Sequence, residues 1–272
     1  MKSLAAVNIR QFERAVESLE AYREVVDMAW KVFLVSGSLT AGAGNPKAGA
    51  ICVVTGSDQG MCGQFNEALV SYTLEEAERL SKEGEDVTFW SVGEKVASAL
   101  EDAGRDGKRF PGADNLNAIN ALVQTIIQEL EAQRSAEGTE RFYLSHNLLA
   151  GGGGYEPTIH RVLPMDKEWM DRYRSQKWPG RCRPMTGLAP DTLFTHLLYQ
   201  YLYVSFFRAL AQSLASENAA RLMAMQAAEK NILEREEALS ASFREQRQAN
   251  ITNELLDIIS GFEALSKKGV AV

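Results

Sequence analysis

The distribution of glycine and proline along the chain constrains its fold more than any other feature of the sequence. All seven prolines lie between Pro46 and Pro190, and 19 of the 21 glycines lie between Gly37 and Gly187. Residues 1–36 and 191–260 therefore contain neither residue type. Because glycine and proline disfavour a helix interior by about 1 and 3 kcal/mol relative to alanine, both ends are predicted to be helical. We expect three parts: an N-terminal helix (1–36), a middle domain (37–190) and a long C-terminal helix (191–272).

The second helical stretch is too long for a compact protein of 272 residues. A helix over residues 191–260 would extend about 105 Å at 1.5 Å per residue. A globule of this chain length has a diameter of roughly 45–50 Å. We therefore expect the helix either to break near Ser213–Ser216 or to extend beyond the globular part, where its apolar stripe would need a partner surface.

Both terminal segments carry apolar residues at the heptad spacing of coiled coils. In the last segment the row comprises Ile251, Leu255, Ile258, Phe262 and Leu265, preceded by the weaker row Leu222, Met225, Ile232, Leu239 and Phe243. In the first segment the row comprises Ile9, Phe12, Val16, Leu19, Val26, Trp30 and Phe33. These rows favour an antiparallel pair of helices. Two amphipathic helices that lie on a sheet would give similar stripes, so this alternative stays open.

Strand-like and helix-like segments alternate between the helical ends. The predicted strands are Ala50–Thr55, Val87–Val92, Phe142–Leu149 and Thr158–Leu163. The predicted helices are Asn66–Lys82, Glu94–Ala103 and a segment that runs from an N-cap at Asp114 to about Arg134. The alternation predicts a mostly parallel sheet with helices on its faces, and the last two strands, joined by the glycines 151–154, could form a hairpin.

The segment Gly56–Gly63 has the strand, glycine-rich turn and helix layout of a phosphate-binding loop. A P-loop ends in lysine followed by serine or threonine, whereas this segment continues with Gln64-Phe65, and its glycines do not have the dinucleotide-binding spacing. A tight turn with positive φ explains the glycines. The three histidines lack metal-ligand spacing, and Cys62 has no base close to it in sequence. We therefore expect no catalytic site, cofactor or metal.

Charge and hydropathy exclude two further classes. The chain has 29 Lys+Arg against 36 Asp+Glu, a net charge of −7, whereas nucleic-acid binding needs clustered positive charge. The apolar stretch 193–214 is interrupted by His196, Gln200, Arg208 and Gln212, so it has no run of about 18 apolar residues that could span a membrane. We expect it to be a helix buried against the middle domain. The three cysteines are unpatterned, which favours reduced thiols.

Three motifs resemble the gamma subunit, or central stalk, of F-type ATP synthases. Residues 57–66 (SDQGMCGQFN) look like the family's SDRGLCGGFN loop, and residues 215–225 (ASENAARLMAM) are similar to its SENAARMMAM helix segment. Residues 247–255 (RQANITNEL) resemble its closing RQAxITxEL signature. The resemblance implies a Rossmann-like α/β middle domain flanked by long N- and C-terminal helices that form an antiparallel coiled coil. The matching loop residues are Ser57, Asp58, Gly60, Cys62, Gly63 and Asn66.

The resemblance implies a rotor without a catalytic role of its own. A single copy would stand inside a hexamer of alpha and beta subunits, with the epsilon subunit and a membrane ring of c subunits at its foot, on the cytoplasmic face of the bacterial inner membrane. Ion flow through the ring would turn the shaft and so drive ATP synthesis, and ATP hydrolysis would turn it in reverse. The matching interface residues are Arg247, Gln248, Ile251, Thr252, Glu254 and Leu255, of which Arg247, Gln248 and Thr252 would contact the catch loop of a beta subunit.

The sequence departs from the family pattern in the loop and at its start. Gln59 stands where an arginine is common, and Gln64 stands where the family has a small residue. Residues 1–6 (MKSLAA) resemble the family's internal MKMVAA segment. We therefore expect Met1 to be an internal methionine of a longer chain, or the shaft tip to be ordered by the hexamer alone. The start is also similar to gamma subunits of the N-type branch, which is often associated with sodium transport. A Rossmann-type nucleotide-binding enzyme and an unrelated coiled-coil scaffold are the alternative functions.

Overall fold

The computed structural model describes residues 2–35, 49–82, 84–150, 154–165, 167–175, 178, 180–182 and 184–269. The predicted boundary at 36–37 and most of the glycine run 151–154 lie outside these residues. The chain forms two compact units, Met1–Ala224 and Met225–Val272. The first unit contains the sheet and all helices except the greater part of the last one, and the second unit is that remaining helical segment.

A five-stranded sheet of order β3-β2-β1-β4-β5 forms the centre of the first unit. Its strands are β1 (Ala50–Thr55), β2 (Val87–Val92), β3 (Lys108–Phe110), β4 (Arg141–Leu149) and β5 (Tyr155–Leu163). β1 pairs in parallel with β2 and β4, β2 pairs in parallel with β3, and β4 pairs antiparallel with β5. The predicted mostly parallel sheet and the hairpin at its end are therefore confirmed.

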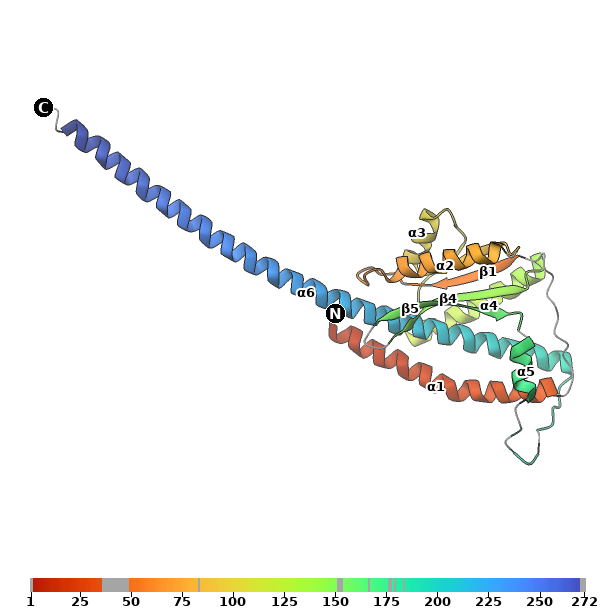
Figure 1. Ribbon diagram of the computed structural model, residues 1–272. Helices are drawn as coiled ribbons and strands as arrows, with labels where there is room; N and C mark the ends of the chain where they lie inside the picture. Colours follow the sequence, from red (N-terminus) through yellow and green to blue (C-terminus); the bar gives the residue numbers. More distant parts are fainter. Residues whose placement is uncertain are drawn as a thin grey trace. The chain divides into compact units, whose positions relative to one another are not determined.

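Alternate residues of the central strands face two different hydrophobic cores, as expected for a sheet covered on both faces. Ala50, Cys52 and Val54 of β1 pack against α2 (Phe65–Lys82) and α3 (Glu94–Asp102). Ile51 and Val53 belong to the other core, with α4 (Leu116–Glu137) and the first part of α6 (Pro190–Gly269). Figure 1 shows α2 and α3 on one side of the sheet, and α4 with this part of α6 on the other.

The first helix, α1 (Lys2–Val35), runs antiparallel to the first part of α6. Near its start, Asn8 Nδ2 donates to Asn218 Oδ1 at 3.4 Å. Farther along, the Tyr22 hydroxyl donates to Gln200 Oε1 at 2.6 Å. Increasing residue numbers on α1 thus meet decreasing numbers on α6, which confirms the antiparallel pair within this unit (Figure 1). The same part of α6 also lies on the sheet core, so both interpretations apply to the row of α1. The rows predicted for the last segment are different: their members from Ile232 to Ile258 are exposed in the second unit.

Aromatic side chains hold the far end of this helix pair. Trp30 of α1 is fully buried and makes edge-on contacts with Phe194 and Tyr201 of α6 at ring-centroid distances of 5.9 and 6.4 Å. Trp169 of α5 (Lys167–Ser175) contacts the Trp30 ring at a centroid distance of 5.5 Å. Such pairs contribute about 0.5–1.5 kcal/mol each beyond the burial of their area. The predicted apolar row of α1 is therefore a core row in this unit.

Helix α6 is continuous, and the break considered near Ser213–Ser216 does not occur. Both serine hydroxyls donate to carbonyl oxygens of the strand layer, so these residues are sites of attachment rather than helix breakers. The predicted burial of 193–214 is confirmed: most of its residues are buried or half-buried. None of the helices, over the residues described, is both long and apolar enough to cross a membrane.

Three local features differ from the sequence predictions. The N-cap of α4 is Asn115 rather than Asp114, because Asn115 has the extended backbone of a cap and its Oδ1 accepts from Ala118 N at 2.9 Å. Strand β3 was not predicted, since its sequence KRF has two exposed charges and only Phe110 is buried. Helix α5 was not predicted either, because Met170 is the only buried residue among those of α5 whose side chains the structure describes.

Candidate functional site at the loop after β1

The loop that follows β1 makes a tight turn at the carboxyl end of the sheet. Gly56 N donates to Val92 O of β2 at 2.9 Å, which fixes the start of the loop against the neighbouring strand. Farther on, Met61 and Gly63 have φ values of 63° and 64°. The predicted turn with positive φ is therefore confirmed, although one of the two such positions is a methionine, a residue type that seldom adopts this conformation.

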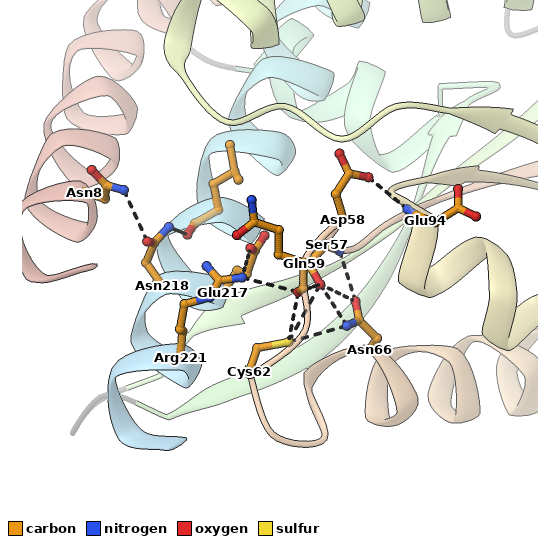
Figure 2. Close-up of polar contacts among 11 residues, drawn as sticks. Asn8, Ser57, Asp58, Gln59, Cys62, Asn66, Glu94, Glu217, Asn218 and Arg221 are labelled. Carbon is orange, nitrogen blue, oxygen red and sulfur yellow. Dashed lines mark hydrogen bonds and ion pairs between the residues drawn. The ribbon is translucent and has the colours of Figure 1, made fainter. Parts of the chain in front are cut away.

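A buried asparagine closes the loop from the first turn of α2. Asn66 Oδ1 accepts from Ser57 N at 3.0 Å, and Asn66 Nδ2 donates to Ser57 Oγ at 2.9 Å. The same Nδ2 lies 3.5 Å from Cys62 Sγ (Figure 2). Burial raises the pKa of the Cys62 thiol, which favours its protonated form and reduces its nucleophilicity. Ser57, Cys62 and Asn66 thus form one structural network.

Asp58 connects the loop to the N-terminus of α3 and to Gly112. Its carboxylate accepts from Glu94 N, in the first turn of α3, at 2.9 Å (Figure 2). It also accepts from Gly112 N at 3.0 Å. The N-terminus of a helix attracts negative charge because its first N–H groups have no partner inside the helix. The loop therefore supplies its own anion to α3, and this aspartate joins the first two βα units of the sheet.

The loop also contacts α6 at the second of the three sequence motifs. Arg221 Nη2 donates to Gln59 O at 3.3 Å and forms an ion pair with Glu217 Oε1 at 2.7 Å (Figure 2). Ala220 packs against Cys62 and Phe65 in a small buried cluster. Burial raises the pKa of Glu217, and the neighbouring Arg221 opposes this shift. The motifs at 57–66 and 215–225, far apart in sequence, are therefore one contact surface.

Hydroxyl groups attach α6 to the ends of two strands beside this contact. Ser213 Oγ donates to Thr55 O of β1 at 3.0 Å, and Ser216 Oγ donates to Asn147 O of β4 at 3.1 Å. The side chain of Asn147 in turn donates to Phe65 O at 3.1 Å. Ser213 and Asn147 were not predicted to be site residues. The sequence signal that could have identified Ser213 is its small hydroxyl side chain in a stretch otherwise rich in leucine, tyrosine and phenylalanine.

The predicted interface residues lie in the second unit, on the part of α6 that follows residue 224. All six are exposed, and they lie on one broad side of the helix: Arg247, Gln248, Ile251, Thr252, Glu254 and Leu255. Thr252 Oγ1 donates to Gln248 O in the preceding turn at 2.9 Å. Their role at a subunit interface stays a prediction. The predicted row members Phe262 and Leu265 have side chains outside the described residues.

The described residues give little ground for redox or metal chemistry. Cys52, Cys62 and Cys182 are free cysteines. Among the residues that the structure describes, no three histidine, cysteine, aspartate or glutamate side chains are grouped so as to hold a metal ion. The geometry at the loop is that of a structural joint between an α/β sheet and a long helix.

Known proteins of one family resemble this chain over nearly its whole length. Residues 1–265 match the family model described as ATP synthase. The ATP synthase gamma chain of Roseobacter denitrificans is 30% identical over 283 residues, which cover 97% of this chain and 92% of that protein. The gamma chain of Paramagnetospirillum magneticum is 29% identical over 277 residues, with the same coverage. A chain in the central stalk and c-ring structure of Tetrahymena thermophila mitochondrial ATP synthase has the same fold, with a TM-score of 0.59, 21% identity and coverage of 84% of this chain and 97% of that chain.

An α/β sheet hydrogen-bonded to the first part of a long helix is the fold of the central-stalk class of proteins. The chain belongs to the gamma subunits of F-type ATP synthases. It is the rotor subunit that couples ion flow to ATP synthesis or hydrolysis, as a part of a membrane-associated complex. The two alternatives, a nucleotide-binding enzyme and an unrelated scaffold, are not favoured.

Proposed function

We propose that a single copy of this chain acts as the shaft within a hexamer of alpha and beta subunits. Residues 226–261 support this proposal, because every side chain in this helical segment is exposed, including large apolar ones. Ile232, Leu239 and Phe243 are 63, 71 and 68% exposed. A helix with such a surface is stable in water only if another protein covers much of it. The epsilon subunit and the ring of c subunits are the other proposed partners.

The shaft acts on the catalytic subunits through contacts that change as it turns. A rotor can bias a catalytic site only if it contacts the open and closed states of that site differently. By thermodynamic linkage, nucleotide binding then acts back on the angle of the rotor. This reciprocity allows the same shaft to serve synthesis and hydrolysis. In this proposal the loop after β1 has a structural role, since Asp58 and Cys62 are engaged in structural contacts.

The proposed contact with a beta subunit lies on the last part of α6. Arg247, Gln248 and Thr252 are exposed and polar, with Ile251 and Leu255 beside them on the same side of the helix. A charge-assisted hydrogen bond from the arginine to an acceptor on the partner would contribute roughly 1.5–3 kcal/mol when shielded from water. The flanking apolar side chains would provide that shielding. Glu254 would add a charge at the edge of this surface.

The proposed location is peripheral, at the cytoplasmic face of the bacterial inner membrane. The support is the family itself together with its relatives in bacteria such as Roseobacter denitrificans. In this arrangement the foot of the rotor rests on the membrane ring, and the shaft points away from the lipid.

Replacement of the polar interface residues in the assembled complex tests the proposal. The triple variant Arg247→Ala, Gln248→Ala and Thr252→Ala should lower ion-coupled ATP turnover several-fold while the complex still assembles. The control is Arg235→Ala, Gln226→Ala and Ser240→Ala, which likewise removes an arginine, a glutamine and a hydroxyl residue from exposed positions of the same helix. Equal turnover in the two variants would contradict the assignment of this interface.

A further inference from the structure

A short part of α6 is enclosed on every side near the end of the first unit. Residues 213–220 are eight consecutive buried residues. Because a helix has 3.6 residues per turn, a buried run of this length covers the whole circumference about twice. Five of the eight are serine or alanine, and such small side chains let neighbouring segments approach the helix backbone closely. Every side chain from residue 226 to residue 261 is exposed, so the enclosure belongs to the first unit alone.

Four segments of the first unit hold this part of α6 by hydrogen bonds. Two serine hydroxyls of the run donate to carbonyl oxygens of β1 and β4. Asn8 of α1 donates to Asn218 Oδ1 at 3.4 Å, and Asn218 Nδ2 donates to Leu214 O at 2.8 Å. Arg221 donates to Gln59 O of the loop after β1 (Figure 2). We call these four segments, namely β1, β4, the loop 57–66 and the start of α1, the collar.

The polar contacts with the collar lie on more than half of the helix circumference. Ser216 and Asn218 are two residues apart and so point about 200° apart, and Ser213 and Arg221 project between them. Within residues 213–220, the remaining side carries buried alanines. Hydrogen bonds are directional, whereas the burial of apolar surface is not. The collar therefore fixes the angle of the helix as well as its position.

A shielded ion pair orients the last of these contacts. Arg221 and Glu217 pair at 2.7 Å, and their side chains are only 15 and 9% exposed. Because both charges are largely removed from water, salt screens their attraction less than that of a surface pair. Both residues belong to α6, so rotation of the helix would preserve the pair and break the bond to Gln59 O. The contact with the loop, rather than the ion pair, therefore resists rotation.

We propose that the collar is the torque joint of this rotor. The positioning residues of the joint are Ser213, Ser216, Asn218 and Arg221. This inference rests on the proposed shaft, because it concerns torque that passes between the first unit and the part of α6 inside the hexamer. A loosened collar lets the helix lag behind the sheet. ATP hydrolysis then continues, while fewer ions are moved for each ATP.

Ser213→Ala with Ser216→Ala tests the joint in the assembled, membrane-bound complex, since it removes both bonds to the strands at little cost in volume. Two ordinary hydrogen bonds change the ratio of held to released helix by about tenfold. We expect the number of ions moved per ATP hydrolysed to fall about twofold or more, with ATP hydrolysis retained. The matched control, Thr195→Ala with Ser205→Ala, removes two hydroxyls of α6 that bond to carbonyl oxygens of the helix itself. It should couple like the unmodified complex.

Arg221 offers a second test with a conservative rescue. Arg221→Gln removes the charge that Glu217 holds in place, so it should lower the ions moved per ATP hydrolysed in the same way. Arg221→Lys keeps a positive charge and an N–H donor, and it should restore most of the coupling. Equal coupling in the glutamine variant and in the unmodified complex would remove Arg221 from the joint.

The angular spread of single complexes separates a loosened joint from a loss of fold. A bead can be attached at Cys182, which is exposed, whereas Cys52 and Cys62 are buried. With the alpha and beta subunits anchored, the bead should show a wider range of angles during each pause in the double serine variant than in its control. Equal angular spread and equal ion-to-ATP ratios in these two would overturn the joint. Failure of the unmodified complex to rotate at all would overturn the proposed shaft, and the joint with it.

Discussion

The hydroxyl of Ser213 on α6 donates to the carbonyl oxygen of Thr55, the last residue of β1, at 3.0 Å. One turn farther along, Ser216 makes the same kind of bond to Asn147 O at 3.1 Å. The two serines are three residues apart and so lie on one face of the helix. Rotation of this segment about its own axis would break both bonds. The first unit therefore fixes the angular setting of α6 at this point, which a rotor requires if torque is to pass between sheet and helix.

Replacement of Gly93 by alanine should destabilise the protein strongly. Gly93 has a φ of 100°, and a Cβ atom there would lie 2.9 Å from the carbonyl carbon and oxygen of Ser57. We expect the free energy of unfolding to fall by about 2–4 kcal/mol, because backbone strain adds to a clash that only backbone movement relieves. Denaturant unfolding of the purified chain measures this change.

Gly104→Ala is the matched control for that variant. Gly104 also has a positive φ, of 69°, but a Cβ atom there would meet nothing within 4 Å. Its cost should be about 1–2 kcal/mol, the penalty for the left-handed backbone alone. If Gly93→Ala proved no more destabilising than Gly104→Ala, the close approach between Gly93 and the loop would not exist in solution.

Asn66→Ala should loosen the loop from the helix joint. The variant removes the acceptor of Ser57 N and leaves this buried donor without a partner. The expected loss is about 1–3 kcal/mol of unfolding free energy, with faster amide hydrogen exchange over residues 57–65. Ser135→Ala, which removes an exposed hydroxyl bonded within its own helix, is the control. Unchanged exchange in the loop would show that Asn66 does not hold it.

Acid should destabilise the protein through His146. Burial lowers the pKa of His146 to about 3, with smaller contributions from His160 and Arg208. The unfolded chain, with a pKa near 6.5, takes up a proton that the folded protein does not. The contribution of His146 to the free energy of unfolding is therefore fully present above about pH 6.5 and is lost as the pH falls toward 3. At pH 5 the expected loss is about 2 kcal/mol.

His146→Gln should flatten that part of the pH profile. The measurement is unfolding free energy between pH 5 and 7 in buffers without phosphate. His196→Gln, a change to an exposed histidine on α6, controls for the loss of a histidine as such. A slope that is the same in the His146 variant and in the unmodified chain would mean that His146 takes up protons equally well in the folded state.

The purified chain should not bind ATP at the loop after β1. The N–H groups of Glu94 and Gly112 are occupied by the carboxylate of Asp58, and the loop has no lysine at its end. Calorimetry with Mg²⁺ and ATP should therefore show no tight binding. Tight binding of ATP would contradict this prediction.

Local chemistry determined much of the fold. Helix breakers are absent from residues 2–35 and 191–260, so the sequence predicted α1 and most of α6. Buried strands read as continuous apolar runs, and β1 and β2 were predicted to the residue. The motif at 57–66 was visible as a turn, because glycine marks the places where the backbone needs unusual φ values. These signals depend on neighbours in sequence.

Only the tertiary structure decided which surfaces meet. The contact of Arg221 with Gln59 joins residues 162 positions apart, and no local pattern encodes such a pairing. Asn8 near the start of α1 contacts Asn218 of α6 because α1 packs antiparallel to the first part of α6. Strand β3 and helix α5 form because neighbours cover Phe110 and Met170, although their own sequences are mostly charged. Burial and long-range hydrogen bonds are properties of the assembled fold, so the sequence determines them only through the packing of the whole chain.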